Sequence, residues 1–303
     1  MPINLDLGVV KQYSNLELLA KQMVEGFITG LHKSPYHGFS VEFAEHRLYN
    51  TGEGTRHIDW KVFAKTDRLY TKRYEEETNL RALILIDNSS SMYYPEPNWG
   101  KIRFSIVAAA CLAYMLQRQR DAVGIAAFSD VIEWETPVKS TPTHIHNVFL
   151  QLQKMFDRLV PHKKTEAAKV IHQVADKIHR RSLIIILSDM LENSAQQAEL
   201  FAALQHLKHN HHEVLLFHTI DKKTEDAFEF EDRPYIFIDL ESNERVKLQP
   251  SQVRAYYREQ ISRQFHELKL KCGQYKIDFI EADIARPLDQ ILLAYLIKRA
   301  KMK

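Results

Sequence analysis

The sequence contains only two cysteines in 303 residues, Cys111 and Cys272, which are too few for a disulfide framework. Cys111 lies inside an apolar segment, and this favours a small core residue over a reactive nucleophile. The chain also lacks a charge excess, because 41 basic residues nearly balance 39 acidic ones. Without a basic stripe interleaved with aromatic side chains, nothing in the sequence favours a nucleic-acid partner.

Long apolar runs are missing as well. The longest apolar stretch, residues 105–116, is too short to cross a bilayer. The first eleven residues show no basic segment followed by an apolar run, which is the pattern of a signal peptide. We therefore expect a cytoplasmic protein in a reducing compartment, without a membrane span.

From Arg81 onward, short apolar runs alternate with segments of helical periodicity. Strands are expected at 82–86, 122–128, 131–136, 182–187, 213–219, 235–238 and 276–280. Helices are expected at 101–118, 144–159, 166–180 and 195–209, and from Pro250 and Pro287 onward. Buried apolar strands separated by helices are typical of an α/β fold with a mostly parallel sheet covered on both faces.

Residues 1–79 follow a different pattern. Ser14 and Glu17 form a capping-box pattern at the start of a helix that extends to about Gly30. Residues 36–79 are charged, aromatic and punctuated by glycines, which favours short extended pieces and tight turns. The chain is thus predicted to comprise an N-terminal extension, 1–79, packed on an α/β domain, 80–303.

The most informative motif is Asp87-Asn88-Ser89-Ser90-Ser91, which directly follows the apolar run 83–86. In an open α/β sheet, ligands bind at the carboxyl ends of the strands, where this motif would lie. One carboxylate and two hydroxyls suit a hard divalent cation such as Mg²⁺. A serine-rich turn without a ligand is the alternative, since Ser and Asn favour turns.

Two further oxygen donors are expected at the same edge of the sheet. Asp189 follows the apolar run 182–187, and Thr165 directly precedes a predicted helix. Together with the first motif they supply five candidate ligands: Asp87, Ser89, Ser91, Thr165 and Asp189.

This Asp-x-Ser-x-Ser motif, with the later Thr and Asp, resembles the metal-ion-dependent adhesion site of von Willebrand factor A domains. Upstream, the segment from Arg47 to Lys61 resembles the signature of domain-of-unknown-function family 58. The matching signature residues are Arg47, Tyr49, Gly52, Arg56, Asp59 and Trp60. Members of that family join the signature to a von Willebrand factor A-like, Rossmann-type domain and are often associated with MoxR-type AAA+ ATPases.

The resemblance implies a role for each candidate residue. Ser89 and Ser91 would bind Mg²⁺ (or Mn²⁺ or Ca²⁺) through their hydroxyls, whereas Asp87, Asp189 and Thr165 would bind it directly or through water. An Asp or Glu from a protein partner would complete the ion's coordination. One departure is Lys164, which stands where a glycine commonly precedes the threonine. The function implied is a non-enzymatic interaction module acting with a MoxR-type ATPase in protein assembly or maturation.

Alternatives remain for several of these features. A structural scaffold with a degenerate metal site is one, and a metal-dependent phosphohydrolase is another. Phosphohydrolases of the haloacid dehalogenase type need a second carboxylate two residues after the nucleophilic Asp, where this chain has Ser89. The signature segment is either a docking surface or a buried Arg–Asp network. The histidines near residue 209 suit either a solvated helix end or, less well, a Zn²⁺ site.

Overall fold

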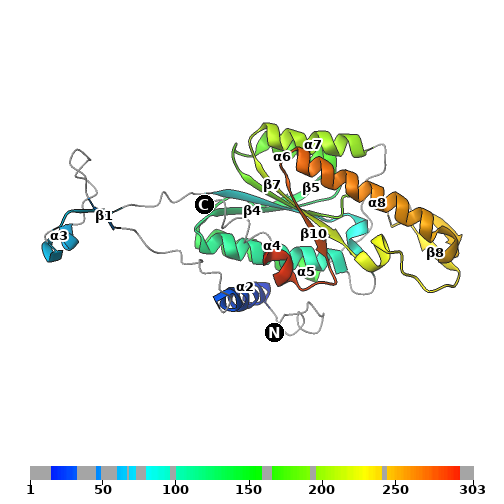
Figure 1. The fold of residues 1–303 in the computed structure, drawn as a ribbon, viewed down its shortest axis with the longest axis horizontal. Helices are drawn as coiled ribbons and strands as arrows, with labels where there is room; N and C mark the ends of the chain where they lie inside the picture. Colours follow the sequence, from blue (N-terminus) through cyan, green and yellow to red (C-terminus); the bar gives the residue numbers. More distant parts are fainter. Residues whose placement is uncertain are drawn as a thin grey trace.

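A six-stranded sheet forms the centre of the protein in the computed structural model (Figure 1). The structure describes residues 15–32, 46–48, 60–66, 68–72, 80–95, 100–158, 166–191, 196–240 and 244–293. The strand order is β10-β7-β6-β3-β4-β5, and all neighbouring pairs are parallel except β4 and β5. The strands are β3 (Arg81–Asp87), β4 (Ala122–Phe128), β5 (Ile132–Glu135), β6 (Leu183–Ser188), β7 (Glu213–Ile220) and β10 (Asp278–Asp283). The predicted α/β fold with a mostly parallel sheet is confirmed.

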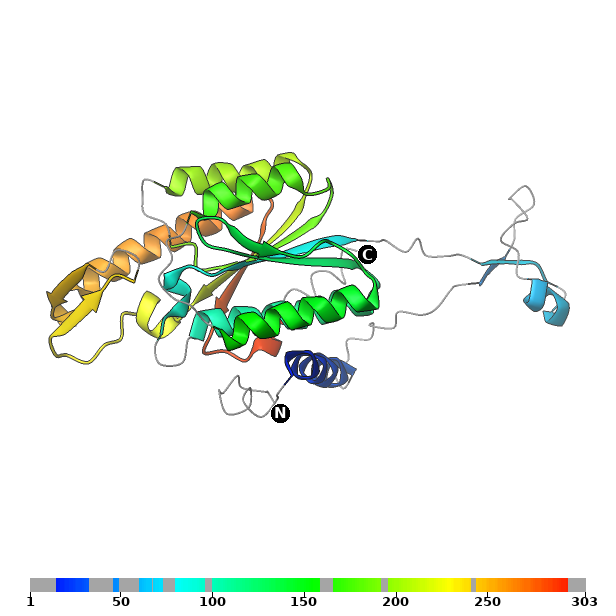
Figure 2. The same ribbon diagram turned by 180° about the vertical axis from the view of Figure 1, so that it is seen from behind.

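Helices cover both faces of this sheet (Figures 1 and 2). One face carries α4 (Gly100–Arg118) and α5 (Pro142–Asp157), with α2 (Leu16–His32) packed outside them. The other face carries α6 (Ala167–Lys177), α7 (Gln197–His209) and α8 (Pro250–Gln274). Because successive side chains of a strand point to opposite faces, Ile84 and Ile86 of β3 belong to the first core and Leu83 and Leu85 to the second. This two-sided burial explains why the central strands read as continuous apolar runs.

The strand order creates a switch point between β3 and β6. From β3 the chain moves through α4 to β4 on one side, and it later returns to place β6 on the other side of β3. Ligands of open α/β sheets bind at the carboxyl ends of the strands at such a point. Asp87 is the last residue of β3 and Asp189 directly follows β6, so the fold brings both to this position.

Several element boundaries differ from the sequence prediction. The bounds of the strand predicted at 276–280 are wrong: β10 starts two residues later and ends three residues later, at Asp278–Asp283. Lys276 has a φ of 55° and ends the turn after α8, which delays the strand. The prediction also missed β9 (Arg245–Leu248), which pairs with β8 (Tyr235–Ile238) as an antiparallel hairpin. The residues of β9 are mostly exposed and charged, so they lack the apolar signal of a core strand.

The N-terminal part contributes α2 to the core. Leu19 and Met23 are buried in the cluster that contains α4, and the Asn15 side chain accepts a hydrogen bond from the Glu17 backbone N–H at 2.8 Å. The predicted capping residue Ser14 lies outside the described residues. Farther on, β1 (His46–Leu48) pairs antiparallel with β2 (Tyr70–Lys72), and α3 (Trp60–Thr66) lies between them in the chain. Within the described residues, none of the helices combines the length and hydropathy needed to cross a membrane.

Candidate metal centre

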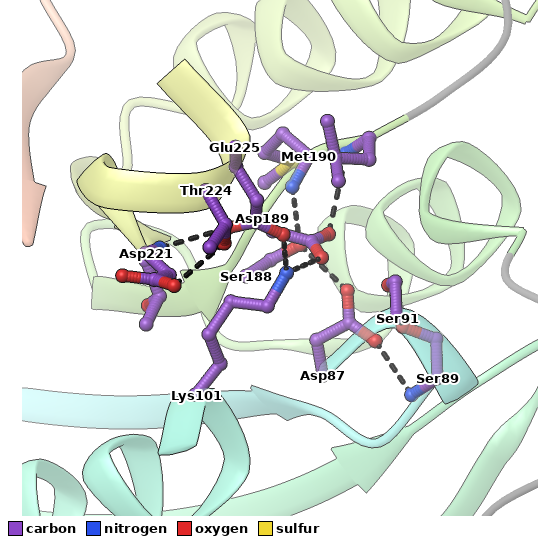
Figure 3. A network of polar contacts seen from close by, with 12 residues as sticks. Asp87, Ser89, Ser91, Lys101, Ser188, Asp189, Met190, Asp221, Thr224 and Glu225 are labelled. Carbon is purple, nitrogen blue, oxygen red and sulfur yellow. Dashed lines mark hydrogen bonds and ion pairs between the residues drawn. The ribbon is translucent and has the colours of Figure 1, made fainter. Parts of the chain in front are cut away.

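Asp87 and Asp189 lie beside each other at the carboxyl edge of β3 and β6 (Figure 3). Both are nearly inaccessible, with 1% and 2% of their surfaces exposed. Ser188, the last residue of β6, joins the two strand ends because its hydroxyl donates a 2.6 Å hydrogen bond to Asp87 Oδ2. The Ser188 hydroxyl in turn accepts the Met190 backbone N–H at 3.0 Å, which fixes the turn that carries Asp189.

The loop after β3 is built from its own polar residues. The Asn88 backbone N–H donates to the Phe128 carbonyl on β4 at 2.6 Å, and the Ser89 backbone N–H donates to Asp87 Oδ1 at 2.9 Å. A short 3-10 helix, η2 (Ser90–Tyr93), follows directly. Tyr93 then donates through its hydroxyl to the Asn88 side chain at 2.8 Å. These bonds hold the Asp-x-Ser-x-Ser motif in one conformation.

The two serine hydroxyls of the motif face each other. Ser89 Oγ and Ser91 Oγ are 3.1 Å apart. Oxygen ligands of Mg²⁺ lie at about 2.1 Å in an octahedron, so adjacent ligands are separated by about 3.0 Å. The hydroxyl pair therefore has the spacing of two adjacent ligands of one such ion. Ser89 is fully buried while Ser91 is partly exposed, so the site is approached from the side of Ser91.

Lys101 and its partner Glu225 were not predicted from the sequence. Lys101 lies in the first turn of α4, is completely buried, and donates a 2.9 Å hydrogen bond to Asp189 Oδ2. The same ammonium forms an ion pair with Glu225 of the π-helical turn η3 (Lys222–Asp226), which follows β7 (Figure 3). Glu225 also accepts the Asp221 backbone N–H at 2.8 Å. The available signal was a lysine at the start of an otherwise apolar helix, together with acids after a third strand.

The pKa values show that Lys101 stabilises the charge of Asp189 but not that of Asp87. Burial, reinforced by the neighbouring Asp189, raises the pKa of Asp87 from 3.8 to about 7. Burial also acts on Asp189, but there the Lys101 ammonium outweighs it and holds the pKa below its ordinary value. A hydrogen bond from Ser91 lowers the pKa of Asp189 further. Lys101 thus neutralises Asp189 and leaves Asp87 with an unfavourable charge.

Counting charges gives the same result. Among the residues that the structure describes, Asp87, Asp189 and Glu225 are buried around a single ammonium, that of Lys101, and Asp221 adds another acid behind Glu225. When all these acids are ionised, at least two negative charges have no cation in the described part of this cluster. Buried charges without partners are costly, so the cluster suits an additional divalent cation.

The remaining predicted site residues are only partly placed. Thr165, Tyr49, Gly52, Arg56 and Asp59 lie outside the described residues. Arg47 lies in β1, and Trp60 is the first residue of α3. Glu166, the first described residue after Thr165, donates its backbone N–H to the Ser129 carbonyl at 3.3 Å, next to the end of β4. This bond ties the start of α6 to the strand that neighbours β3.

The donor set determines which cations fit. Among the described residues, no three or more His, Cys, Asp or Glu side chains are placed to hold a metal ion together. The cluster at Asp87 instead combines hydroxyls with carboxylates, which are hard oxygen donors that fit Mg²⁺ or a similar ion. Burial raises the pKa of the Cys111 thiol to about 12, which agrees with the core role predicted for it.

Comparison with known proteins identifies the family. The family model described as "Protein of unknown function DUF58" matches residues 45–267, which is most of the chain. The chain belongs to this family. Among its relatives are the uncharacterized proteins Rv1480 of Mycobacterium tuberculosis and Mb1516 of Mycobacterium bovis. Each is 24% identical over 176 residues, covering 58% of this chain and 55% of the relative, so the chain spans about half the length of these curated relatives.

Two solved structures show a limited likeness to this DUF58 protein. An aerotolerance-related membrane protein from Bacteroides fragilis has a TM-score of 0.44 at 14% identity, covering 72% of this chain and 99% of that chain. A mutant of the PilB minor pilin from Streptococcus sanguinis has a TM-score of 0.43 at 7% identity, covering 78% and 64%. Both TM-scores are too low to carry an argument about this chain.

The raised pKa of Asp87 predicts a pH dependence of stability. In a chelator, the folded protein keeps the Asp87 proton up to about pH 7, whereas the unfolded chain loses it near pH 4. The contribution of Asp87 therefore falls as pH rises through this window, by an amount on the order of a few kcal/mol. We expect the free energy of unfolding of Asp87→Asn, relative to wild type, to increase from pH 4 to pH 7 in urea titrations. If the free energies of unfolding of the two proteins changed in parallel with pH, the raised pKa of Asp87 would be contradicted.

The ion pairs of Lys101 predict a compensating pair of substitutions. Lys101→Met leaves Asp189 and Glu225 buried without a cation, and such a change costs about 3–5 kcal/mol of stability. Adding Glu225→Gln removes one of the stranded charges, so the double variant should recover part of this loss. Urea unfolding of the two single variants and the double variant measures the coupling energy between Lys101 and Glu225. If the losses of unfolding free energy were strictly additive, the two residues would not be paired.

Proposed function

We propose that this DUF58 protein is a non-enzymatic interaction module that binds a partner's carboxylate through a divalent cation. The observation that carries the proposal is the cluster of buried acids Asp87, Asp189 and Glu225, which outnumber the Lys101 ammonium, beside two facing serine hydroxyls. Mg²⁺ is the first candidate ion, with Mn²⁺ and Ca²⁺ as alternatives. In this proposal the site corresponds to the metal-ion-dependent adhesion site of von Willebrand factor A domains.

The roles of the residues follow from their contacts. Ser89 and Ser91 offer hydroxyl oxygens at the spacing of adjacent ligands. Asp87 accepts hydrogen bonds from Ser188 and Ser89, and Asp189 accepts them from Lys101, Leu191 and Ser91. In this proposal the two carboxylates hold the ion directly or through water. Thr165 remains the proposed fifth donor.

A carboxylate from outside fits this arrangement for an electrostatic reason. Neutral hydroxyl ligands donate little charge, so the ion keeps a strong affinity for an anionic ligand. Lys101 strengthens this effect because it already neutralises Asp189. Ser91 is the partly exposed ligand, which gives an external Asp or Glu access from that side.

The proposed partner is a protein, with a MoxR-type AAA+ ATPase as the first candidate, in the assembly or maturation of other proteins in the cytoplasm. This part of the proposal is supported by the signature resemblance and by membership of the family.

Lys101 also supports a second candidate function. Its ammonium lies against one oxygen of Asp189, as a bound cation would. A scaffold whose degenerate site is stabilised by Lys101 alone would then bind its partner without metal.

Calorimetric titration with MgCl₂ tests the metal claim. We expect saturable binding to wild type and a stabilisation of about 2.7 kcal/mol at a hundredfold excess over Kd. Asp87→Ala should abolish both effects. Asp121→Asn is a matched control, because Asp121 is another buried acid at the opposite edge of the sheet, where it accepts the Leu80 N–H. Equal Mg²⁺ binding and equal stabilisation of wild type and Asp87→Ala would contradict the proposed metal site.

Capture of partners from the native host separates the two candidate functions. The same three proteins serve as bait, with and without chelator. Loss of a partner in chelator and with Asp87→Ala, but not with Asp121→Asn, supports binding through the ion. Partner binding that survives both changes favours the scaffold.

A further inference from the structure

A second group of potential metal ligands lies on the surface formed by α6 and α7. His172 on α6 and His206 on α7 point their Nδ1 atoms at each other, 2.9 Å apart, and their ring centroids are 5.2 Å apart. His206 lies near the end of α7 that leads into the start of β7, so the pair is directed toward the amino edge of the sheet. The Asp87 cluster occupies the opposite, carboxyl edge.

The two helices hold this pair through residues one turn farther along each helix. Asp176, four residues after His172, places Oδ1 3.4 Å from His206 Nε2. Asn210, four residues after His206, donates to the Ala175 carbonyl at 2.8 Å and thereby ties α7 to α6. Its amide nitrogen also lies 3.5 Å from His206 Nε2, at the limit of a hydrogen bond.

We propose that His172 and His206 form a binding site for a borderline divalent transition-metal ion, with both Nδ1 atoms as ligands and water in the other positions. Imidazole nitrogens bind such ions at about 2.0–2.1 Å. Two nitrogens 2.9 Å apart therefore subtend about 90° at the ion. This angle fits the square or octahedral shells of Cu²⁺ and Ni²⁺ better than the tetrahedral shell of Zn²⁺.

Asp176 prepares His206 for this role. When Nδ1 binds an ion, Nε2 carries the ring proton, and Asp176 is the carboxylate placed to accept it. In the metal-free protein, the two Nδ1 atoms share one N–H···N hydrogen bond. Metal binding then requires the proton on one Nδ1 to move to Nε2 of the same ring, so that both Nδ1 atoms present lone pairs.

Most of the histidines near residue 209 lie outside this site. His212 is buried at the start of the sheet, where its Nδ1 accepts the Ser182 backbone N–H, and His209 is exposed. Only His206 of that group takes part, and its partner is 34 residues away in the sequence. The proposal also stands apart from the Mg²⁺ site, because its ligands are nitrogens that hard cations do not prefer.

Titration of the full chain with NiCl₂, in excess MgCl₂, tests the proposal. We expect saturable binding of one ion at this site, weakened on the order of tenfold or more by His172→Gln or His206→Gln, and about tenfold by Asp176→Asn. His209→Gln removes an exposed histidine from the same helix and should leave the affinity unchanged. Asp87→Ala should also leave it unchanged, which separates this outcome from that of the Mg²⁺ experiment.

A second measurement needs no variant. Substoichiometric Cu²⁺ should broaden the ring NMR signals of His172 and His206 in the wild type before those of other histidines. Equal Ni²⁺ affinity of wild type and the double variant His172→Gln/His206→Gln would overturn the proposal. An equal loss of Ni²⁺ affinity with His209→Gln would also overturn it. The same holds if Cu²⁺ leaves the ring signals of His172 and His206 unbroadened.

Discussion

The burial of Lys101 among Asp189 and Glu225 is the interaction on which the rest of the site depends. It joins the first turn of α4, the end of β6 and the turn η3 after β7. A cation in the first turn of a helix opposes the helix dipole, at a cost of about 0.3–1 kcal/mol. Two buried carboxylates offset this cost, and the ion pairs tie the start of α4 to the end of β6 and to η3. The causes that set the pKa of Asp87 include no such ion pair, and its pKa is raised.

This unequal compensation links the fold to the proposed function. A parallel sheet with a switch point collects polar loops at one edge, and here the collected groups include the buried acids Asp87, Asp189, Asp221 and Glu225. Lys101 supplies one positive charge to this cluster. The buried acids can be balanced further by the charge of a divalent ion. A site completed in this way would change its charge and its ligand affinity when the ion binds. Binding of a partner would then depend on the ion without any chemical step.

Much of the architecture could be predicted from the sequence because the central strands are apolar on both faces. The run before Asp87 and the run before Asp189 identified two neighbouring strand ends, and the structure places them side by side. Hairpin strand β9 was missed because its residues are exposed and carry no core pattern. Lys101 and Glu225 were missed for a different reason: their pairing joins residues 124 positions apart, which no local periodicity encodes. The same holds for His172 and His206.

The central claim is that the serine pair next to Asp87 holds a divalent cation. Anomalous diffraction from crystals grown with Mn²⁺ tests it most directly, because Mn²⁺ scatters anomalously and takes the same oxygen ligands. The account predicts an anomalous peak within ligand distance of both Ser89 Oγ and Ser91 Oγ, adjacent to Asp87 and Asp189. A map without a peak there, from crystals in which Mn²⁺ is bound elsewhere on the protein, would contradict it.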